Sequence, residues 1–294
     1  MRLSAFIRST VCLGTCLGAR AALTPISNWG TNPTNLQVQA YIPSKLEASP
    51  AVILALHTCG GSAAFYHMDA NYDQYADKKG FIVVYPSTTK DNNCWDVAST
   101  KSLTYEGGGD STGLANIVRY MISKYNADPK RIFAVGSSSG CMMTNVLLAT
   151  YPDLFNAGSC YSGIPAGCLA GSPGSSPQSA DPTCANGRNI KTGDQWAKQA
   201  KAMRPGWNGT YPRLQTFHGS ADTFVSYTNF GEQLKQWSTI HGISFTGNTT
   251  NSPRAGDTKM VYGDGSVLVG ISVANAGHPV RDDQQADLAW FGLL

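Results

Sequence analysis

The sequence RIFAVGSSSG, residues 131–140, joins a predicted buried strand to a predicted helix. Its apolar first half is typical of a strand covered on both faces, and apolar residues recur at helical spacing over residues 142–148. A chain that reverses from strand to helix passes through strained backbone angles. The two glycines of this G-x-S-x-G motif remove the Cβ atoms that would collide there. The stretch therefore predicts a sharp strand–turn–helix unit with Ser138 at its tip.

Ser138 is the candidate nucleophile of this turn. The motif exposes its hydroxyl at the carboxyl edge of a sheet. The amide of Ser139 opens the following helix, where unpaired N–H groups and the helix dipole favour a developing negative charge. Acyl transfer requires this arrangement. A serine-rich turn that only caps a helix is the alternative, because a bare G-x-S-x-G also occurs by chance.

Further strands and helices alternate along the chain on both sides of this unit. Apolar strands are predicted at residues 36–42, 51–56, 81–85, 157–161, 213–217 and 267–273, and helices at 72–79, 110–125, 195–203, 227–240 and 282–290. This alternation predicts an α/β fold, a single domain whose mostly parallel sheet is covered by helices on both faces. Residues 163–187, rich in Pro, Gly and Ser, are expected to form a surface excursion near the site.

The first residues of the 294-residue chain have the pattern of a secretory leader. Two arginines precede a short run of small and apolar residues, and Ala19-Arg20-Ala21 has the small-x-small form of a signal-peptidase site. No later stretch approaches the roughly 20 apolar residues that span a bilayer. We therefore expect a signal peptide at residues 1–21, a folded domain at residues 22–294, and a secreted protein without a membrane anchor.

The charge of the chain is low and evenly spread. Charged residues make up 14% of the sequence, against roughly 25% in an average domain, and the net charge of +3 is not clustered. No basic patch indicates nucleic acid as a partner. A weakly charged surface suits an extracellular protein that meets a neutral or insoluble partner, and we expect a monomer. Asn208 and Asn248 begin N-x-T sequons, which predicts glycosylation on exposed loops.

Six of the eight cysteines remain once Cys12 and Cys16 leave with the leader. Six cysteines in an exported chain allow fifteen pairings, so the sequence alone does not choose among them. Proximity in the expected fold favours three disulfides, which are Cys59–Cys94, Cys141–Cys160 and Cys168–Cys184. For the second pair, two unpaired and buried thiols are the alternative.

A serine nucleophile needs an imidazole to take its proton and a carboxylate to orient that imidazole. Asp222 and His278 both follow predicted strands after Ser138, and parallel strands bring their carboxyl ends to one edge of a sheet. The order Ser, Asp, His is typical of α/β-hydrolases. We predict Ser138 as nucleophile, His278 as base and Asp222 as acid. The weaker alternatives are His218, which suits structural hydrogen bonding, and Asp264, which suits a hairpin turn.

A second donor for the oxyanion is expected in the loop after the strand at residues 51–56, which reads HTCGG. Its glycines let backbone amides turn inward, and a disulfide from Cys59 would hold the loop still. We predict the amides of Cys59 and Ser139 as oxyanion-hole donors. A loop that needs glycine only for its turn is the alternative. The sequence has no H-E-x-x-H, phosphate-binding loop or zinc-spaced Cys/His set, so we expect no cofactor and no metal.

These motifs form a set at residues 32–33, 41–43, 57–62, 93–96, 136–146, 161–163, 218–222 and 277–278. The set resembles the secreted esterases of carbohydrate esterase family 1, the feruloyl and acetylxylan esterases, which are also similar to polyhydroxybutyrate depolymerases. The resemblance covers nearly the whole mature chain. It implies an α/β-hydrolase esterase domain with Ser138, Asp222 and His278 as the triad. It also implies Cys59 and Ser139 as the oxyanion amides, and a bridge between Cys59 and Cys94.

The resemblance also implies a substrate class. Residues 59–63 and 243–264 are more similar to type B feruloyl esterases, whereas Trp95 is closer to the acetylxylan pattern. We expect hydrolysis of feruloyl or related hydroxycinnamoyl esters on plant cell-wall arabinoxylan, with removal of acetyl groups from xylan as the alternative. Trp95 and Tyr161 are expected to contact the acyl or sugar group, with core packing as the alternative. A non-catalytic polysaccharide-binding protein would require a broken triad, and all three members are present.

Overall fold

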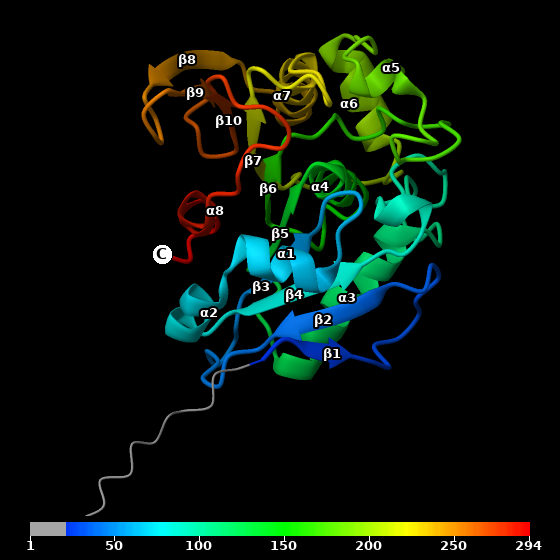
Figure 1. The fold of residues 1–294 in the computed structure, drawn as a ribbon, viewed down its shortest axis with the longest axis vertical. Coiled ribbons are helices and arrows are strands. Elements are labelled where there is room, and N and C mark those ends of the chain that lie inside the picture. The colour runs from blue at the N-terminus through cyan, green and yellow to red at the C-terminus, as the bar shows by residue number, and fades with distance from the viewer. Residues whose placement is uncertain (1–21) are drawn as a thin grey trace, which may run out of the picture.

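A computed structural model describes residues 22–294, which build a ten-stranded mixed sheet with helices on both faces (Figure 1). The predicted leader at residues 1–21 lies outside the described residues. The strands are β1 (Thr24–Ile26), β2 (Gln37–Tyr41), β3 (Val52–Leu56), β4 (Ile82–Ser87), β5 (Ile132–Ser137), β6 (Ala157–Tyr161), β7 (Arg213–Gly219), β8 (Phe245–Thr250), β9 (Asp257–Tyr262) and β10 (Leu268–Val273). The helices are α1 (Ala63–Ala70), α2 (Asp73–Lys79), α3 (Asp110–Tyr125), α4 (Ser139–Thr150), α5 (Pro182–Ala185), α6 (Gly193–Lys201), α7 (Thr228–His241) and α8 (Gln284–Phe291), with a 3-10 turn, η1, at Asp91–Asn93.

The central strands of the sheet are parallel. The strand order is β1-β2-β4-β3-β5-β6-β7-β10-β9-β8, in which the strands from β4 to β10 run the same way and the outer pairs are antiparallel. Strands β3 to β6 are buried along their whole length, because their apolar runs are covered on both faces. The parallel strands therefore end at one edge, where the loops after β3, β5, β7 and β10 carry the predicted site residues.

Helices cover both faces of the sheet, as the alternating pattern predicts. Helices α3, α4, α6 and α7 pack with one core cluster, and α1, α2 and α8 pack with the other (Figure 1). The fold prediction is thus confirmed as one α/β domain. Within residues 22–294, no helix combines the length and apolar character that a membrane crossing demands.

The sequence prediction missed strands β1, β8 and β9 and helices α1 and α5. Strand β8 reads FTGNTT and is almost fully exposed, so it lacks the apolar alternation by which a strand is recognised. It exists because its backbone pairs with β9 at the edge of the sheet. Helix α1 begins directly after the loop that follows β3, the predicted oxyanion loop at residues 57–61, and the side chain of Ser62 accepts a hydrogen bond from the amide of Phe65.

Three disulfides join the predicted cysteine pairs, Cys59–Cys94, Cys141–Cys160 and Cys168–Cys184. The first ties the loop after β3 to the end of η1. The second is fully buried between α4 and β6, so the alternative of two unpaired thiols is wrong. The third closes part of the excursion at residues 163–187, because both of its cysteines lie within that segment.

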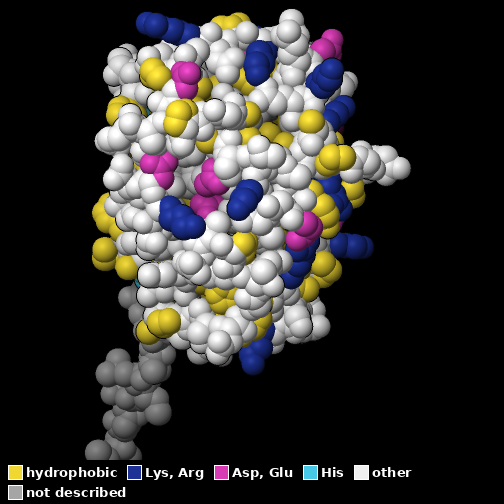
Figure 2. Space-filling view, turned by 90° about the vertical axis from the view of Figure 1, so that its right-hand side faces the viewer, with side chains coloured by type: hydrophobic (Ala, Val, Ile, Leu, Met, Phe, Trp, Pro, Cys, Tyr) yellow, Lys and Arg dark blue, Asp and Glu magenta, His cyan; other side chains and the backbone are white. Residues whose placement is uncertain are grey.

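The surface is only weakly charged. In Figure 2, which shows the face at the right of Figure 1, basic and acidic side chains are interspersed among a majority of uncharged atoms. The glycosylation acceptors Asn208 and Asn248 are both exposed, although Asn248 lies on edge strand β8 rather than in a loop. Glycosylation itself stays a prediction.

Candidate active site

Ser138 lies between β5 and α4 with a strained backbone. Its φ of 54° and ψ of −118° lie in a region that residues with a side chain rarely adopt. The neighbouring glycines explain how the turn closes. A Cβ at Gly136 would lie 2.3 Å from the carbonyl carbon of Gly140, and a Cβ at Gly140 would lie 2.0 Å from the oxygen of Leu56. The predicted sharp turn is therefore present, and only glycine fits at both positions.

Ser138, His278 and Asp222 meet at the carboxyl edge of the sheet. The Oγ of Ser138 is 2.8 Å from Nε2 of His278, and Nδ1 of His278 is 2.7 Å from Oδ2 of Asp222. They come from the loops after β5, β10 and β7, which lie within four neighbouring strands of the sheet. Residues that are 140 and 56 positions apart in sequence thus form one continuous hydrogen-bonded chain.

The carboxylate of Asp222 is set for the charged form. Burial acts to raise its pKa, but hydrogen bonds from His218, His278 and the amide of Val225 outweigh burial and lower the pKa well below its usual range. Its Oδ1 also accepts hydrogen bonds from the amides of Phe224 and Val225, at 3.0 and 2.9 Å. An anion so placed holds the proton of His278 on Nδ1 and leaves Nε2 free to accept the proton of Ser138.

The two weaker alternatives from the sequence lie elsewhere. His218 is fully buried behind Asp222, where its Nε2 is 3.3 Å from Oδ2 of Asp222 and 2.9 Å from the carbonyl oxygen of Val225. This is the structural role that the sequence favoured. Asp264 occupies the exposed turn between β9 and β10 and accepts hydrogen bonds from Ser266. It shapes that turn and has no contact with His278.

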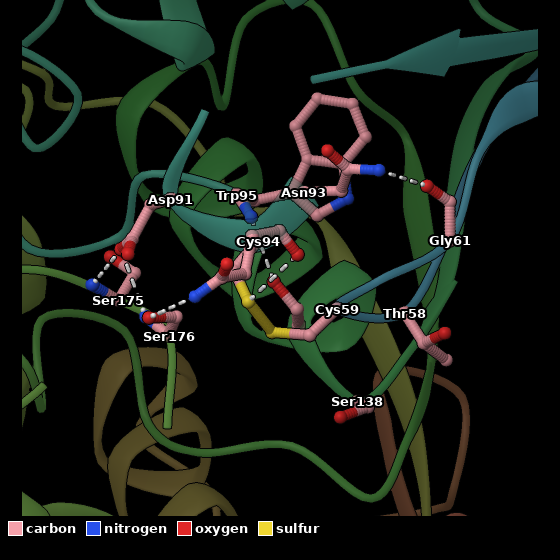
Figure 3. Close-up of a disulfide and its surroundings, with 12 residues drawn as sticks. Thr58, Cys59, Gly61, Asp91, Asn93, Cys94, Trp95, Ser138, Ser175 and Ser176 are labelled. Atoms are coloured by element: carbon pink, nitrogen blue, oxygen red, sulfur yellow. Dashed lines mark hydrogen bonds between the residues drawn. A yellow bond between two sulfur atoms is a disulfide. The ribbon is translucent and has the colours of Figure 1, made fainter. Parts of the chain in front are cut away.

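The loop after β3 is held next to Ser138 by several contacts (Figure 3). Cys59 is bridged to Cys94, the amide of Gly60 donates to the carbonyl of Asn92 at 2.9 Å, and the side-chain amide of Asn93 donates to the carbonyl of Gly61 at 3.1 Å. Cys59 and Ser138 line the same two hollows of the surface. The loop is thus rigid and lies beside the hydroxyl of Ser138, which suits the predicted donor role of the Cys59 amide.

The side chain of Trp95 lies in a core cluster, as the core-packing alternative from the sequence describes. It is fully buried, and its Nε1 donates to the carbonyl oxygen of His57 at 2.9 Å. Its backbone amide donates to Oγ of Ser139, also at 2.9 Å. Burial lowers the pKa of His57, which favours the neutral form of its ring. This ring packs against the ring of Trp95. Trp95 therefore links the oxyanion loop to the start of α4 from inside the protein.

The side chain of Tyr161 likewise lies in a core cluster, as the core-packing alternative from the sequence describes. Its side chain is fully buried, its ring stacks on Phe217 with 4.6 Å between centroids, and its hydroxyl donates to Oδ1 of Asp287 at 2.6 Å. Residue type alone suggested both aromatic contacts. Only the packing shows that the two rings point into the core, away from the edge that carries Ser138.

Two hollows meet at Ser138. The first, which we call the apolar cavity, has a volume of about 260 Å³ and is lined largely by apolar side chains such as Met142, Ile164, Leu169 and Val225. The second, which we call the open cleft, is wider, with a volume of about 690 Å³. Its lining includes His278 and the polar groups Asp69, Asn92 and Gln178. Ser138 thus lies between a small apolar space and a broad, more polar one.

Phe65 and Phe224 line the open cleft and were missed by the sequence analysis. Both rings are more than half exposed, at 54% and 56%. Phe224 also borders the apolar cavity, and its ring centroid lies 5.1 Å from that of His278. Their positions in the sequence could have indicated that they lie near the site, because Phe224 follows Asp222 by two residues and Phe65 follows the predicted oxyanion loop. Across residues 22–294, no group of His, Cys, Asp or Glu side chains is arranged to hold a metal ion.

Comparison with known proteins finds relatives over most of the chain. Residues 36–261 match the family model described as Esterase PHB depolymerase. The chain is 49% identical over 273 residues to feruloyl esterase B from Talaromyces funiculosus, covering 93% of this chain and 77% of that protein. It is 41% identical over 274 residues to acetylxylan esterase A from Emericella nidulans, covering 92% and 89%. A solved acetyl xylan esterase from Aspergillus awamori matches with a TM-score of 0.87 and 39% identity, covering 93% of this chain and 100% of that one.

Proposed function

The chain belongs to the esterase PHB depolymerase family, as its motifs predict, and on this premise we propose that it is a secreted serine esterase releasing feruloyl groups from plant cell-wall arabinoxylan. The relatives are named as feruloyl or acetylxylan esterases, which are carboxylic ester hydrolases. This chain is a carboxylic ester hydrolase as well. The proposal adds three things to that class. It assigns the reacting residues, it chooses the acyl group, and it gives each hollow of the site a part of the substrate.

Ser138 attacks the ester carbonyl while Nε2 of His278 takes its proton. The 2.8 Å separation of the two atoms supports direct transfer. Asp222 stays anionic and stabilises the imidazolium that forms. The negative charge on the former carbonyl oxygen is stabilised by the amides of Cys59 and Ser139. Removing one such donor typically costs about 3 to 4 kcal/mol of transition-state stabilisation, so a loop held by a disulfide is well suited to the role.

The second half of the reaction uses the same groups. His278 gives its proton to the leaving sugar alkoxide as the tetrahedral intermediate collapses, which leaves an acyl group on Ser138. Water then attacks this acyl-enzyme with His278 again as base, and the free acid leaves.

The observation that carries the choice of acyl group is the apolar cavity beside Ser138. Its volume of about 260 Å³ corresponds to roughly nine water molecules at about 30 Å³ each. An acetyl group would leave most of this space empty, whereas a planar hydroxycinnamoyl group would fill it and bury its ring against apolar side chains such as Met142 and Ile164.

The open cleft takes the sugar. It is wider and lies on the side of His278, where the leaving alkoxide must receive its proton. The half-exposed rings of Phe65 and Phe224 offer flat apolar faces to a sugar ring, and the polar groups of Asn92 and Gln178 offer hydrogen bonds to its hydroxyls.

Removal of acetyl groups from xylan is the second candidate. It is favoured by the match to a solved acetyl xylan esterase at a TM-score of 0.87, together with the relatives of that name. The two functions share the same triad and differ only in what fills the apolar cavity.

Two esters with one leaving group test the choice. We expect kcat/KM for p-nitrophenyl ferulate to exceed that for p-nitrophenyl acetate by at least about tenfold, because only the larger acyl group fills the cavity. Ferulate should also be released from arabinoxylan faster than acetate from acetylated xylan. The Ser138→Ala variant is the control, since it removes the nucleophile but keeps both hollows. Equal or faster hydrolysis of the acetyl esters would replace the feruloyl proposal by the acetyl one.

A further inference from the structure

One wall of the apolar cavity is an irregular segment. Residues 174–182, which we call the wall segment, contribute Ser175, Ser176, Pro177 and Ala180 to the cavity lining. Before α5 begins at Pro182, this segment contains neither helix nor strand. A stretch without regular backbone pairing depends on other contacts for its position, so the width of the cavity depends on what holds the wall segment in place.

The carboxylate of Asp91 holds the middle of the wall segment (Figure 3). Its Oδ2 accepts hydrogen bonds from the amides of Ser175 and Ser176, at 2.6 and 2.9 Å. The hydroxyl of Ser179 lies 2.7 Å from Oδ1 and 2.9 Å from Oδ2. One side chain therefore binds three donors spread over five residues of the wall.

Asp91 belongs to the turn that also supports the oxyanion loop. Asp91, Asn92 and Asn93 have φ values of 46°, 57° and 56°, so three successive residues with side chains adopt left-handed backbone. The turn leads directly into Cys94, whose disulfide ends at Cys59 in the oxyanion loop. Asp91 thus joins the wall of the apolar cavity to the same rigid unit that positions the oxyanion amide.

We propose that Asp91 is a specificity-determining positioning residue, whose carboxylate fixes the wall segment relative to the oxyanion loop and so shapes the apolar cavity for a planar aromatic acyl group. This inference rests on the proposed function, because it concerns the acyl group that the cavity accepts. Asp91 touches no reacting atom, and it acts through the position of Ser175 and Ser176.

The charge of Asp91 fits this role. Partial burial acts to raise its pKa, but hydrogen bonds from Ser176, Ser175 and Ser179 outweigh it and lower the pKa. The donors therefore bind the anion in preference to the neutral acid. An asparagine at this position would have one acceptor oxygen and one donor group, so it could not accept from two amides and a hydroxyl through both side-chain atoms.

The test uses Asp91→Asn with p-nitrophenyl ferulate and p-nitrophenyl acetate. We expect kcat/KM for the feruloyl ester to fall by about tenfold, mainly through a higher KM, while kcat/KM for the acetyl ester changes by less than about twofold. An acetyl group fills only a small part of the cavity, so its hydrolysis should depend less on the position of the wall segment. Ser179→Ala removes one of the three donors without altering the turn at Asp91, and it should shift the same ratio in the same direction by a smaller factor.

Asp264→Asn is the matched control. Asp264 also accepts hydrogen bonds from an amide and a hydroxyl, both of Ser266, but in the exposed turn between β9 and β10. Asp264→Asn should leave the ratio of the two kcat/KM values unchanged. The inference is overturned if Asp91→Asn leaves the ratio of the two kcat/KM values unchanged. This would hold if neither value fell, or if both fell equally at an unchanged thermal unfolding midpoint. A wild-type protein that prefers the acetyl ester would instead overturn the feruloyl proposal itself.

Discussion

Asp222 is the residue in which local backbone geometry and electrostatics are most closely coupled. Its turn after β7 supplies the amides of Phe224 and Val225 as donors, and its other oxygen faces His278. These contacts favour the carboxylate, so the pKa is lowered in spite of burial. The orientation of His278 therefore depends on a charge that the fold itself stabilises.

Asp222→Asn tests this at the scale of one residue. We expect kcat on p-nitrophenyl ferulate to fall by about 10³- to 10⁴-fold with little change in KM, because an amide facing Nδ1 stabilises the wrong tautomer of His278. Asp264→Asn, which alters the other aspartate considered for this role, should keep wild-type kcat. An Asp222→Asn protein that retained more than about a tenth of wild-type kcat would remove Asp222 from the triad.

At the scale of elements, the oxyanion loop and the turn η1 form one supported unit. Cys59–Cys94, the Gly60 and Asn93 hydrogen bonds, and the contacts of Trp95 all join the loop after β3 to residues 91–95. The unit contacts the wall segment through Asp91 (Figure 3), and its Cys59 lines the same hollows as Ser138. Loosening this unit should therefore lower kcat even under conditions in which the protein as a whole stays folded.

Removal of the Cys59–Cys94 bridge tests this unit. In a Cys59→Ala/Cys94→Ala double variant we expect kcat to fall by about tenfold or more at a temperature where the protein is still folded, because the oxyanion amide loses its fixed position. Circular dichroism verifies folding. The buried Cys141–Cys160 bridge provides the comparison, since its double alanine variant should lower the unfolding midpoint and leave kcat near wild type. Loss of activity only in step with unfolding would show that the bridge does not preorganise the loop.

At the scale of the whole molecule, a buried polar cluster connects the helices on one face to the loop that carries His278. Tyr66 donates to Asp282 at 2.6 Å, and Tyr72 and Tyr161 donate to Asp287 at 2.5 and 2.6 Å. Burial raises the pKa of Asp282 to about 8, helped by the charges of Asp287 and Asp69. Burial likewise raises the pKa of Asp287 to about 6, although its hydrogen bonds act to lower it.

The cluster makes stability depend on pH. Between the unfolded pKa near 3.9 and the folded pKa of about 8, the folded state keeps a proton on Asp282 that the unfolded state has lost, so stability falls as pH rises across this window. Asp287 adds to the fall up to about pH 6. Asp222 acts oppositely, because its lowered pKa contributes stability above the unfolded pKa that is lost in stronger acid.

Asp282→Asn should flatten this dependence. We expect the free energy of unfolding of the variant, from urea titrations between pH 4 and 8, to fall less steeply with pH than that of the wild type. The two slopes should differ by at most about 1.4 kcal/mol per pH unit, the contribution of one titrating proton. The amide keeps the shape of the side chain but cannot ionise. Asp194→Asn, a change at an exposed aspartate on α6, should retain the wild-type slope. Parallel pH profiles for wild type and Asp282→Asn would show that Asp282 does not titrate in this window.

Much of this arrangement was predictable because it depends on local patterns. The apolar runs of β3 to β6 identified the central strands, and the G-x-S-x-G motif identified the turn at Ser138. The triad followed from chain order and from the rule that parallel strands end at one edge. By contrast, β8 carries no apolar alternation, and it forms only because β9 offers a partner.

The amino-acid sequence by itself determined the α/β domain and the three residues that meet at the sheet edge, since each follows from residue type and spacing. Only the tertiary structure decided which aromatic rings line the open cleft and what shapes the cavity beside Ser138. Trp95 and Tyr161 became core, while Phe65 and Phe224 line the cleft. The reason is physical: the direction of a side chain and the position of an irregular segment are set by contacts with residues remote in sequence, such as those between Asp91 and Ser175.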